Sequence, residues 1–256
     1  MNTITEHAAL LAWIDELDIP EASGTRVRTK PVRTHANAEE EGAAVVRGSI
    51  TSFVTGLTQQ AREDVQNSTL LMQLAADKKY DPEKQRQEWF KFYTDGLANL
   101  GWGRVTAFYQ DYQPKNTNVT MNQVVLEVIA AVVSASSPIY KITEQTFKAL
   151  QDNPDNAQPL KLFDNSSTRE SVGTFQILPV MQDRDGNVVM VLTTINASTK
   201  VQKGSFLFWS WSKTEAWMYR AAQQTVLNEQ VYAKVRQAVI DKLGQNAEDF
   251  IEGLEI

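Results

Sequence analysis

The chain has 256 residues, of which 42% are hydrophobic and 22% are charged, and a formal net charge of −6. This composition suits a folded globular protein and excludes the disordered, collagen-like and coiled-coil classes. The sequence contains no cysteine, which excludes disulfides, thiolate nucleophiles and zinc–thiolate sites. Because His7 and His35 are the two histidines, imidazole metal clusters and a Ser-His-Asp triad are disfavoured as well.

The acidic net charge disfavours nucleic acid as a partner. Residues 1–20 lack the basic start and the uninterrupted apolar stretch of a secretory signal. The longest strongly apolar run, residues 124–135, is shorter than the about 20 residues that a transmembrane helix requires. We therefore expect one soluble domain over residues 1–256, with no transmembrane helix, that is cytoplasmic or released without a Sec signal.

The N-terminal region is predicted to hold one helix and one exposed segment. Apolar residues at spacings of three and four predict a helix over 4–17, which Pro20 ends. Residues 23–37 contain no acidic residue and few large apolar ones, and we interpret them as a basic exposed loop or linker. Its four charges are Arg26, Arg28, Lys30 and Arg33.

Three elements are predicted between residues 39 and 113. Apolar residues at helical spacing run from Val46 to Leu74 and predict one long helix, or two that separate near Gly56 or Asn67. A second helix is predicted over 81–101, where Asp81 precedes a proline at the first helical position. Residues 103–113 are rich in aromatic and β-branched residues and predict a strand.

The most apolar helix is predicted over 121–134, where Thr120 and Gln123 form a capping box. Few polar residues interrupt this segment, so we expect it to be the buried central helix. A short helix follows around 143–151. Residues 152–171 show little periodicity and predict a long loop, which is a possible subdomain boundary.

Strands dominate the next region. Residues 173–182 and 187–195 flank a turn that contains Asp185-Gly186, and this dipeptide between β-branched runs is typical of a hairpin. Residues 204–212 predict a third strand. From about residue 214 we expect helix again, ending in a helix over 229–243 that Asn228 caps.

Together these elements predict an α+β fold that is mostly helical. Its sheet is expected to be small, with three or four antiparallel strands that form a meander around 173–212, and the strand at 103–113 can join it. This sheet is expected to pack against the central apolar helix over 121–134.

Common catalytic and cofactor motifs are absent from the sequence. There is no phosphate-binding loop, no G-x-S-x-G nucleophile motif and no complete dinucleotide fingerprint. The turn at 183–187 resembles part of a calcium loop, but the positions that require carboxylates hold Met181 and Leu192. We therefore expect no catalytic residue, metal or cofactor to be identifiable from motifs.

Glu127 is the most notable ionisable residue, because it lies in the apolar helix over 121–134. A buried carboxylate requires a partner or a water pocket, and such positions are enriched at functional sites. Alternatively, Glu127 shares a polar stripe with Gln123 and simply reaches solvent.

Six aromatic residues form the second candidate site. They are Phe206, Phe208, Trp209, Trp211, Trp217 and Tyr219. Because side chains alternate along a strand, the strand at 204–212 is apolar on both faces. It is therefore either covered twice in the core, or it presents one face to a ligand, a partner or a membrane.

The basic patch of Arg26, Arg28, Lys30 and Arg33 is a third candidate. It is interpreted as a solvated loop, or as a docking site for an acidic partner, for the acidic C-terminal region of the chain itself, or for a membrane surface.

Three functions follow from these features. The sequence favours a non-enzymatic binding or interaction protein, with an apolar pocket for an acyl chain or lipid, or a partner surface, formed by the aromatics at 204–219. The alternative is a membrane-active toxin or virulence factor of bacterial type that inserts a helical segment at 124–135 or the hairpin at 173–195. The third hypothesis is a hydrolase that uses Glu127.

Overall fold

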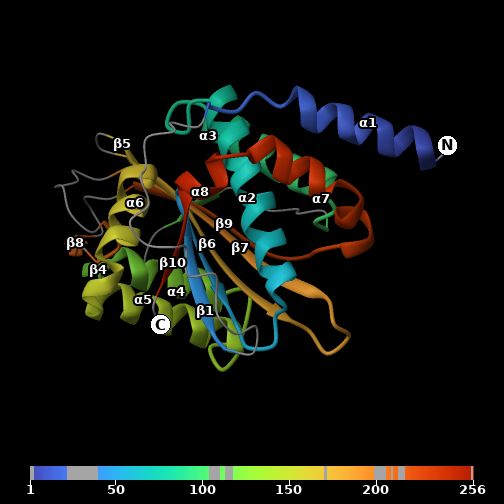
Figure 1. The fold of residues 1–256 in the computed structure, drawn as a ribbon. Coiled ribbons are helices and arrows are strands. Elements are labelled where there is room, and N and C mark those ends of the chain that lie inside the picture. Colours follow the sequence, from blue (N-terminus) through green and yellow to red (C-terminus); the bar gives the residue numbers. More distant parts are fainter. Residues whose placement is uncertain are drawn as a thin grey trace.

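The computed structural model describes most of the chain as a sheet between two layers of helices (Figure 1). The described residues are 3–21, 40–103, 110–112, 118–169, 172–198, 206–208, 210–212, 217–254 and 256. The predicted α+β class is confirmed.

The main sheet is larger than predicted, and it is mixed. Within the described residues its strands follow the order β10-β1-β2-β6-β7-β9-β3. All neighbours are antiparallel except β2 and β6, which are parallel. The bounds are β1 (Gly42–Val46), β2 (Ser49–Phe53), β3 (Gln110–Tyr112), β6 (Val172–Gln182), β7 (Val188–Ser198), β9 (Trp217–Val226) and β10 (Ile251–Leu254). The expectation of three or four antiparallel strands is therefore wrong.

Three short strands lie outside this order. The first, β5 (Thr168–Arg169), folds back on the start of β6. The other two, β4 (Asn118–Thr120) and β8 (Ser210–Ser212), pair with each other in a separate small sheet. The described residues of the segment predicted as the third strand, 206–208 and 210–212, are therefore not part of the meander, and residues 206–208 form a 3-10 turn.

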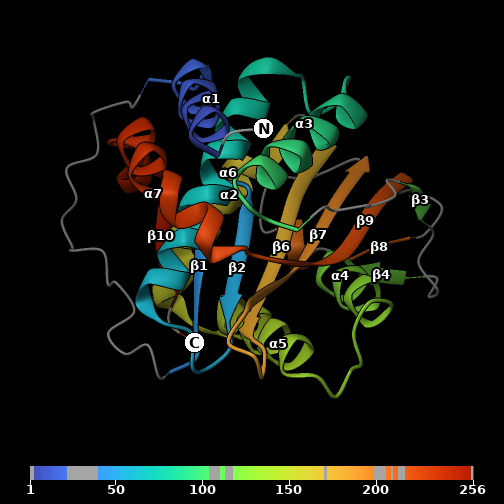
Figure 2. The same ribbon diagram turned by 90° about the vertical axis from the view of Figure 1, so that its right-hand side faces the viewer.

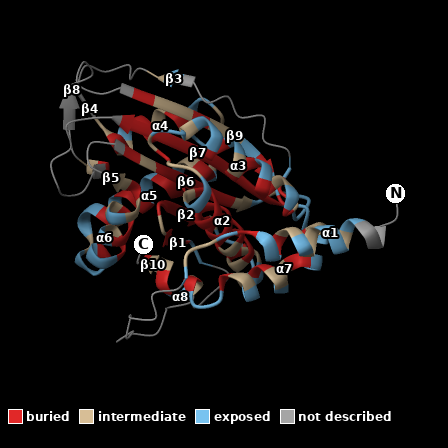
Figure 3. Cartoon of the chain, turned by 90° about the horizontal axis from the view of Figure 1, so that it is seen from above, coloured by how far each residue is buried: buried red, intermediate tan, exposed pale blue. Residues whose placement is uncertain are grey.

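Helices cover both faces of the main sheet (Figure 2). On one face lie α2 (Gln59–Lys79), α3 (Arg86–Asn99), α7 (Glu229–Leu243) and α8 (Asn246–Phe250), and α1 (Thr3–Glu16) packs on α7. On the other face lie α4 (Met121–Ala130), α5 (Pro138–Asp152) and α6 (Ala157–Ser167). Each face has its own buried apolar core, and the central strands are buried along most of their length (Figure 3).

Local sequence explains several helix boundaries. The Thr120 and Gln123 side chains form the predicted capping box of α4. At α7, the Asn228 side chain accepts a hydrogen bond from the backbone N–H of Val231, and Gly244 follows the helix with a φ of 48°. These boundaries agree with the prediction because the residues that set them are adjacent in sequence.

The long helix predicted from Val46 is wrong in its first part, because residues 42–53 form the hairpin β1–β2. Both faces of this hairpin are covered, so its residues are buried without alternation. A doubly buried strand lacks the period of two that marks strands in a sequence. Its turn places Arg47 at a φ of 52°, and helix begins only at Gln59.

Three other segments differ from the prediction. Residues 152–171 are not a long loop, since most of them form a 3-10 turn at Pro154–Asn156, α6 and β5. Residues 217–226 form β9 instead of a helix. The helix predicted over 121–134 ends at Ala130, and the most enclosed helix is α2.

No helix in the described part of the chain combines the length and the apolar character that crossing a membrane requires.

Candidate functional site

The meander of β6, β7 and β9 is the most distinctive part of the sheet. Its strands have 11, 11 and 10 residues. The first two contain no charged residue, and Arg220 is the one charge in the third. Both sides of the meander are covered by helices, and the residues that contact these helices differ between the two sides.

The side facing α4, α5 and α6 is almost entirely apolar. Phe163 of α6 meets Phe175 of β6 edge to face, with ring centres 5.7 Å apart. The other meander residues that are buried in this apolar cluster are Ile177, Val191, Ile195, Ala197 and Met218. The helices are held on this side of the meander by the hydrophobic effect, which does not require any particular orientation of the contacting groups.

The side facing α2 and α3 mixes apolar and polar residues. Near the 183–187 turn it carries apolar groups such as Leu178 and Met190. At the other end the Asn196 side chain donates to the Thr174 hydroxyl at 2.6 Å. On this side of β7, two buried atoms, Thr194 Oγ1 and Asn196 Oδ1, have no hydrogen-bond partner within the described residues. Each such atom costs about 1–3 kcal/mol of stability.

Hydrogen bonds between side chains connect α2 to this polar side. The amide of Gln73 donates to Ser49 Oγ at 2.7 Å, and the Ser49 hydroxyl donates to Gln176 Oε1 at 2.8 Å. Beside them is a pocket with a cavity volume of about 20 Å³, which one water molecule can fill. Its lining includes Gly48, Gln73, Asp77, Trp89, Ser166 and Thr174.

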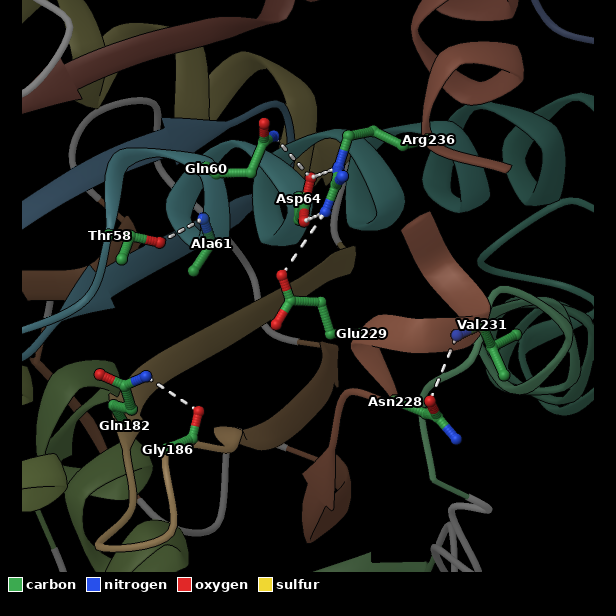
Figure 4. Close-up of polar contacts among 10 residues, drawn as sticks. All are labelled: Thr58, Gln60, Ala61, Asp64, Gln182, Gly186, Asn228, Glu229, Val231 and Arg236. Carbon is green, nitrogen blue, oxygen red and sulfur yellow. Dashed lines mark hydrogen bonds and ion pairs between the residues drawn. The ribbon is translucent and has the colours of Figure 1, made fainter. Parts of the chain in front are cut away.

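Ion pairs hold α2 at both ends (Figure 4 shows the first). Arg236 of α7 donates from Nε and Nη2 to the two carboxylate oxygens of Asp64, at 2.8 and 2.7 Å. Asp64 is only 2% exposed, and the hydrogen bonds to it raise the pKa of Arg236. At the other end, Asp77 accepts from Arg47 Nε at 3.0 Å and from Trp89 Nε1 at 2.7 Å.

The turn of the β6–β7 hairpin is stabilised by Asp183. Its carboxylate accepts hydrogen bonds from the backbone N–H groups of Asp185 and Asn187, at 2.9 and 2.8 Å. The bond from the Asn187 side chain is the largest cause of the lowered pKa of Asp183. Gln182 Nε2 also bonds to the carbonyl of Gly186, at 2.8 Å (Figure 4). In the described residues no group of three or more metal-ligating side chains could hold a metal ion.

Glu127 lies on α4 and is partly exposed. The hydroxyl of Tyr112, on the edge strand β3, donates a hydrogen bond to its carboxylate. The pKa of Tyr112 is raised by burial first and then by Glu127. On the same side of the sheet, the guanidinium of Arg220 lies 4.9 Å from the centre of the Tyr112 ring. Glu127 does not line the pocket at Gln73.

Among the candidate aromatics, the two with described side chains lie on opposite sides of the sheet. Phe208 packs into the α4–α6 cluster, whereas Tyr219 lies on the other side, where the guanidinium of Arg86 is 4.3 Å from its ring centre. Phe206, Trp211 and Trp217 have described backbone only, and Trp209 lies outside the described residues. Leu207, fully buried against α4, occupies part of the space where an apolar pocket was expected.

The basic patch of Arg26, Arg28, Lys30 and Arg33 lies outside the described residues. Conversely, Tyr112, Arg220 and the polar residues under α2 were not among the candidates from the sequence. The sequence does show a lone arginine among the uncharged residues at 217–226. It becomes notable as a candidate only once this segment is recognised as a strand.

No protein-family model matches the chain, and no curated protein sequence matches it. Among solved structures, one described as a delta-endotoxin has 15% sequence identity, covers 82% of this chain and 89% of its own, and has a TM-score of 0.42. The Evf virulence factor has 12% identity, coverage of 91% and 90%, and a TM-score of 0.38. The activated Cyt2Ba monomer from Bacillus thuringiensis subsp. israelensis has 16% identity, coverage of 70% and 96%, and a TM-score of 0.37. Residue roles are therefore inferred from the geometry of this chain alone, and not from these structures.

Proposed function

We propose that the chain is a membrane-active protein and that the meander of β6, β7 and β9 is the part that enters lipid. The observation that carries this proposal is the absence of charge from the two 11-residue strands β6 and β7. At about 3.3 Å per residue such a strand is about 36 Å long. Strands that cross the hydrocarbon core need about 9–11 residues.

The two sides of the meander suit this role in different ways. The side now facing α4, α5 and α6 is apolar and would face lipid chains. The mixed side, with Gln176, Thr194 and Asn196, would face water, where their polar atoms gain partners. The backbone groups at the outer strand edges must also be paired in lipid, so we expect several copies of the chain to act together.

Entry into lipid requires the helices to leave the sheet. On the α2 side this separation transfers polar groups such as Gln73 and Ser49 to water at little cost, because water replaces their hydrogen bonds. The apolar groups of that side, such as Leu178 and Met190, would also be exposed, and their exposure opposes the separation. On the other side, separation exposes the apolar cluster, and lipid chains would replace the helices there. The folded chain is thus a covered form of the membrane-entering sheet.

A disulfide between α5 and the sheet tests this proposal. The hydroxyl oxygens of Thr146 in α5 and Ser52 in β2 are 2.9 Å apart, a spacing that a disulfide can bridge with little backbone movement. Because α5 also packs on β6, the variant Ser52→Cys/Thr146→Cys should hold the helix on the meander when oxidised. The natural chain contains no cysteine, so no other disulfide can form within one chain.

The assay is release of a dye from vesicles of phosphatidylcholine and phosphatidylglycerol over a range of pH. The oxidised variant should release little dye, and a reductant should restore the rate of the unmodified chain, which serves as the control under both conditions. If the unmodified chain releases no dye at any pH, the proposed function is wrong. If the oxidised and reduced variants release dye equally fast, the proposal that the meander must be exposed is wrong.

A further inference from the structure

We propose that Arg220 is a binding site for the phosphate of lipid headgroups, which Tyr112 and Glu127 keep closed while the chain is folded as described. The proposal rests on the proposed membrane function and names the lipid chemistry that the meander recognises.

Arg220 is isolated among uncharged residues. It is the one charged residue among the strands β6, β7 and β9, and it lies opposite Ile195 of β7 and Gln110 of β3. Its position in β9 puts it on the side of the sheet that faces α4, together with Met218. A cation on a mostly apolar surface is costly to keep unless it has a ligand in some state of the protein.

In the described residues the guanidinium of Arg220 makes no hydrogen bond or ion pair, and its Nε is buried without a partner. The contact that it does make is with the ring of Tyr112, 4.9 Å from the ring centre. A cation over an aromatic face is stabilised only modestly. The planar guanidinium of Arg220 can therefore donate two parallel hydrogen bonds to an anion such as a phosphate.

Glu127 supplies a negative charge beside this site in the folded chain. Its carboxylate accepts the hydroxyl of Tyr112, whose ring contacts Arg220. Glu127 belongs to α4, whereas Arg220 belongs to β9. Departure of α4 from the sheet would remove the carboxylate and leave the cation on the strand, so a lipid phosphate would take over the role of balancing it.

The position of Arg220 along the strand fits the depth of a headgroup. It lies three residues from Trp217, the first residue of β9, which is about 10 Å along the strand. That end of the meander is opposite to the 183–187 turn. A long arginine side chain reaches from such a depth to the interface.

The test measures partition of the full chain into vesicles of phosphatidylcholine, which carries a phosphate, and of digalactosyldiacylglycerol, which does not. The partition coefficient of the unmodified chain should be about tenfold higher for phosphatidylcholine, because one hydrogen bond to a charged group changes an equilibrium constant by about that factor. Arg220→Gln should lose that preference. Lys234→Gln, an equal loss of charge at an exposed site on α7, should keep it.

A second variant acts in the opposite direction. Glu127→Gln keeps an oxygen that can accept the Tyr112 hydroxyl but removes the charge, so it should increase partition into phosphatidylcholine and leave partition into the galactolipid unchanged. The proposal fails if the unmodified chain shows no preference, or if both Arg220→Gln and Glu127→Gln partition like the unmodified chain. In these cases dye release by the unmodified chain would still support the membrane function, and its absence would refute both.

Discussion

Replacing Arg236 by methionine should destabilise the chain strongly, because the carboxylate of Asp64 would stay buried without its cation. Asp64 is 2% exposed and receives two hydrogen bonds from Arg236, at 2.8 and 2.7 Å. After the substitution Asp64 keeps the hydrogen bond from Gln60 Nε2 at 3.0 Å. Removing one partner of a buried pair costs about 3–5 kcal/mol.

We expect a value near the lower end, about 3 kcal/mol, because the Arg236 side chain is 23% exposed and water can approach the carboxylate. Urea unfolding followed by the fluorescence of the six tryptophans measures the free energy directly. A loss of this size is a large part of the about 5–15 kcal/mol that holds a domain folded.

Two controls separate the buried pair from a general loss of charge. Lys91→Met breaks an exposed pair with Asp95 and should cost less than about 1 kcal/mol. Asp64→Leu combined with Arg236→Met removes both charges and should be less harmful than Arg236→Met alone. If Arg236→Met costs no more than Lys91→Met, or if the double variant is the less stable of the two, the reasoning about α2 and α7 is refuted.

Three further outcomes are expected from unfolding experiments. The pKa of Asp183 is lowered mainly by the hydrogen bond from Asn187. The Asp183 carboxylate therefore stabilises the fold fully above the ordinary aspartate pKa of about 4, and this stabilisation is lost as the pH falls through the lower pKa of the folded chain. The difference in urea midpoint between the unmodified chain and Asp183→Asn should shrink over that range. Thr194→Val removes a buried hydroxyl without a described partner and should stabilise by about 1 kcal/mol, whereas Thr146→Val, whose hydroxyl is bonded, should destabilise; equal effects would contradict this. Gly101→Ala, at a φ of 99° with the carbonyl oxygen of Asn228 at 3.1 Å from the new Cβ, should cost about 2 kcal/mol. Gly56→Ala should cost less, because Gly56 has a similar φ of 92° but open space around the new Cβ.

The elements that could be predicted are those whose causes are local. The cap at Asn228, the capping box at Thr120 and the Asp185-Gly186 turn each involve residues within a few positions of one another. The strand β9 could not be predicted in this way, because alanines and glutamines in its second half have weak strand preference. Its conformation comes from pairing along its length with β7.

The same distinction applies to the site. Glu127 was notable from its own helix, and the structure gives it a partner in Tyr112, 15 residues away. Arg220 joins them from a strand more than 100 residues from Tyr112, through the pairing of β3 with β9. Its isolation from other charges becomes visible only when the strands are aligned, so sequence spacing could not predict this group.

The pairing of β1 with β10 has a consequence for synthesis of the chain. Ala43 lies opposite Leu254, and Val46 lies opposite Ile251, so the outer edge of β1 does not pair with β10 until residues 251–254 have left the ribosome. An unpaired edge next to charge-free strands is a template for association with other chains. The sheet is therefore completed only after residues 251–254 have been made, and chains whose synthesis stops before residue 251 should depend on chaperones to stay dispersed.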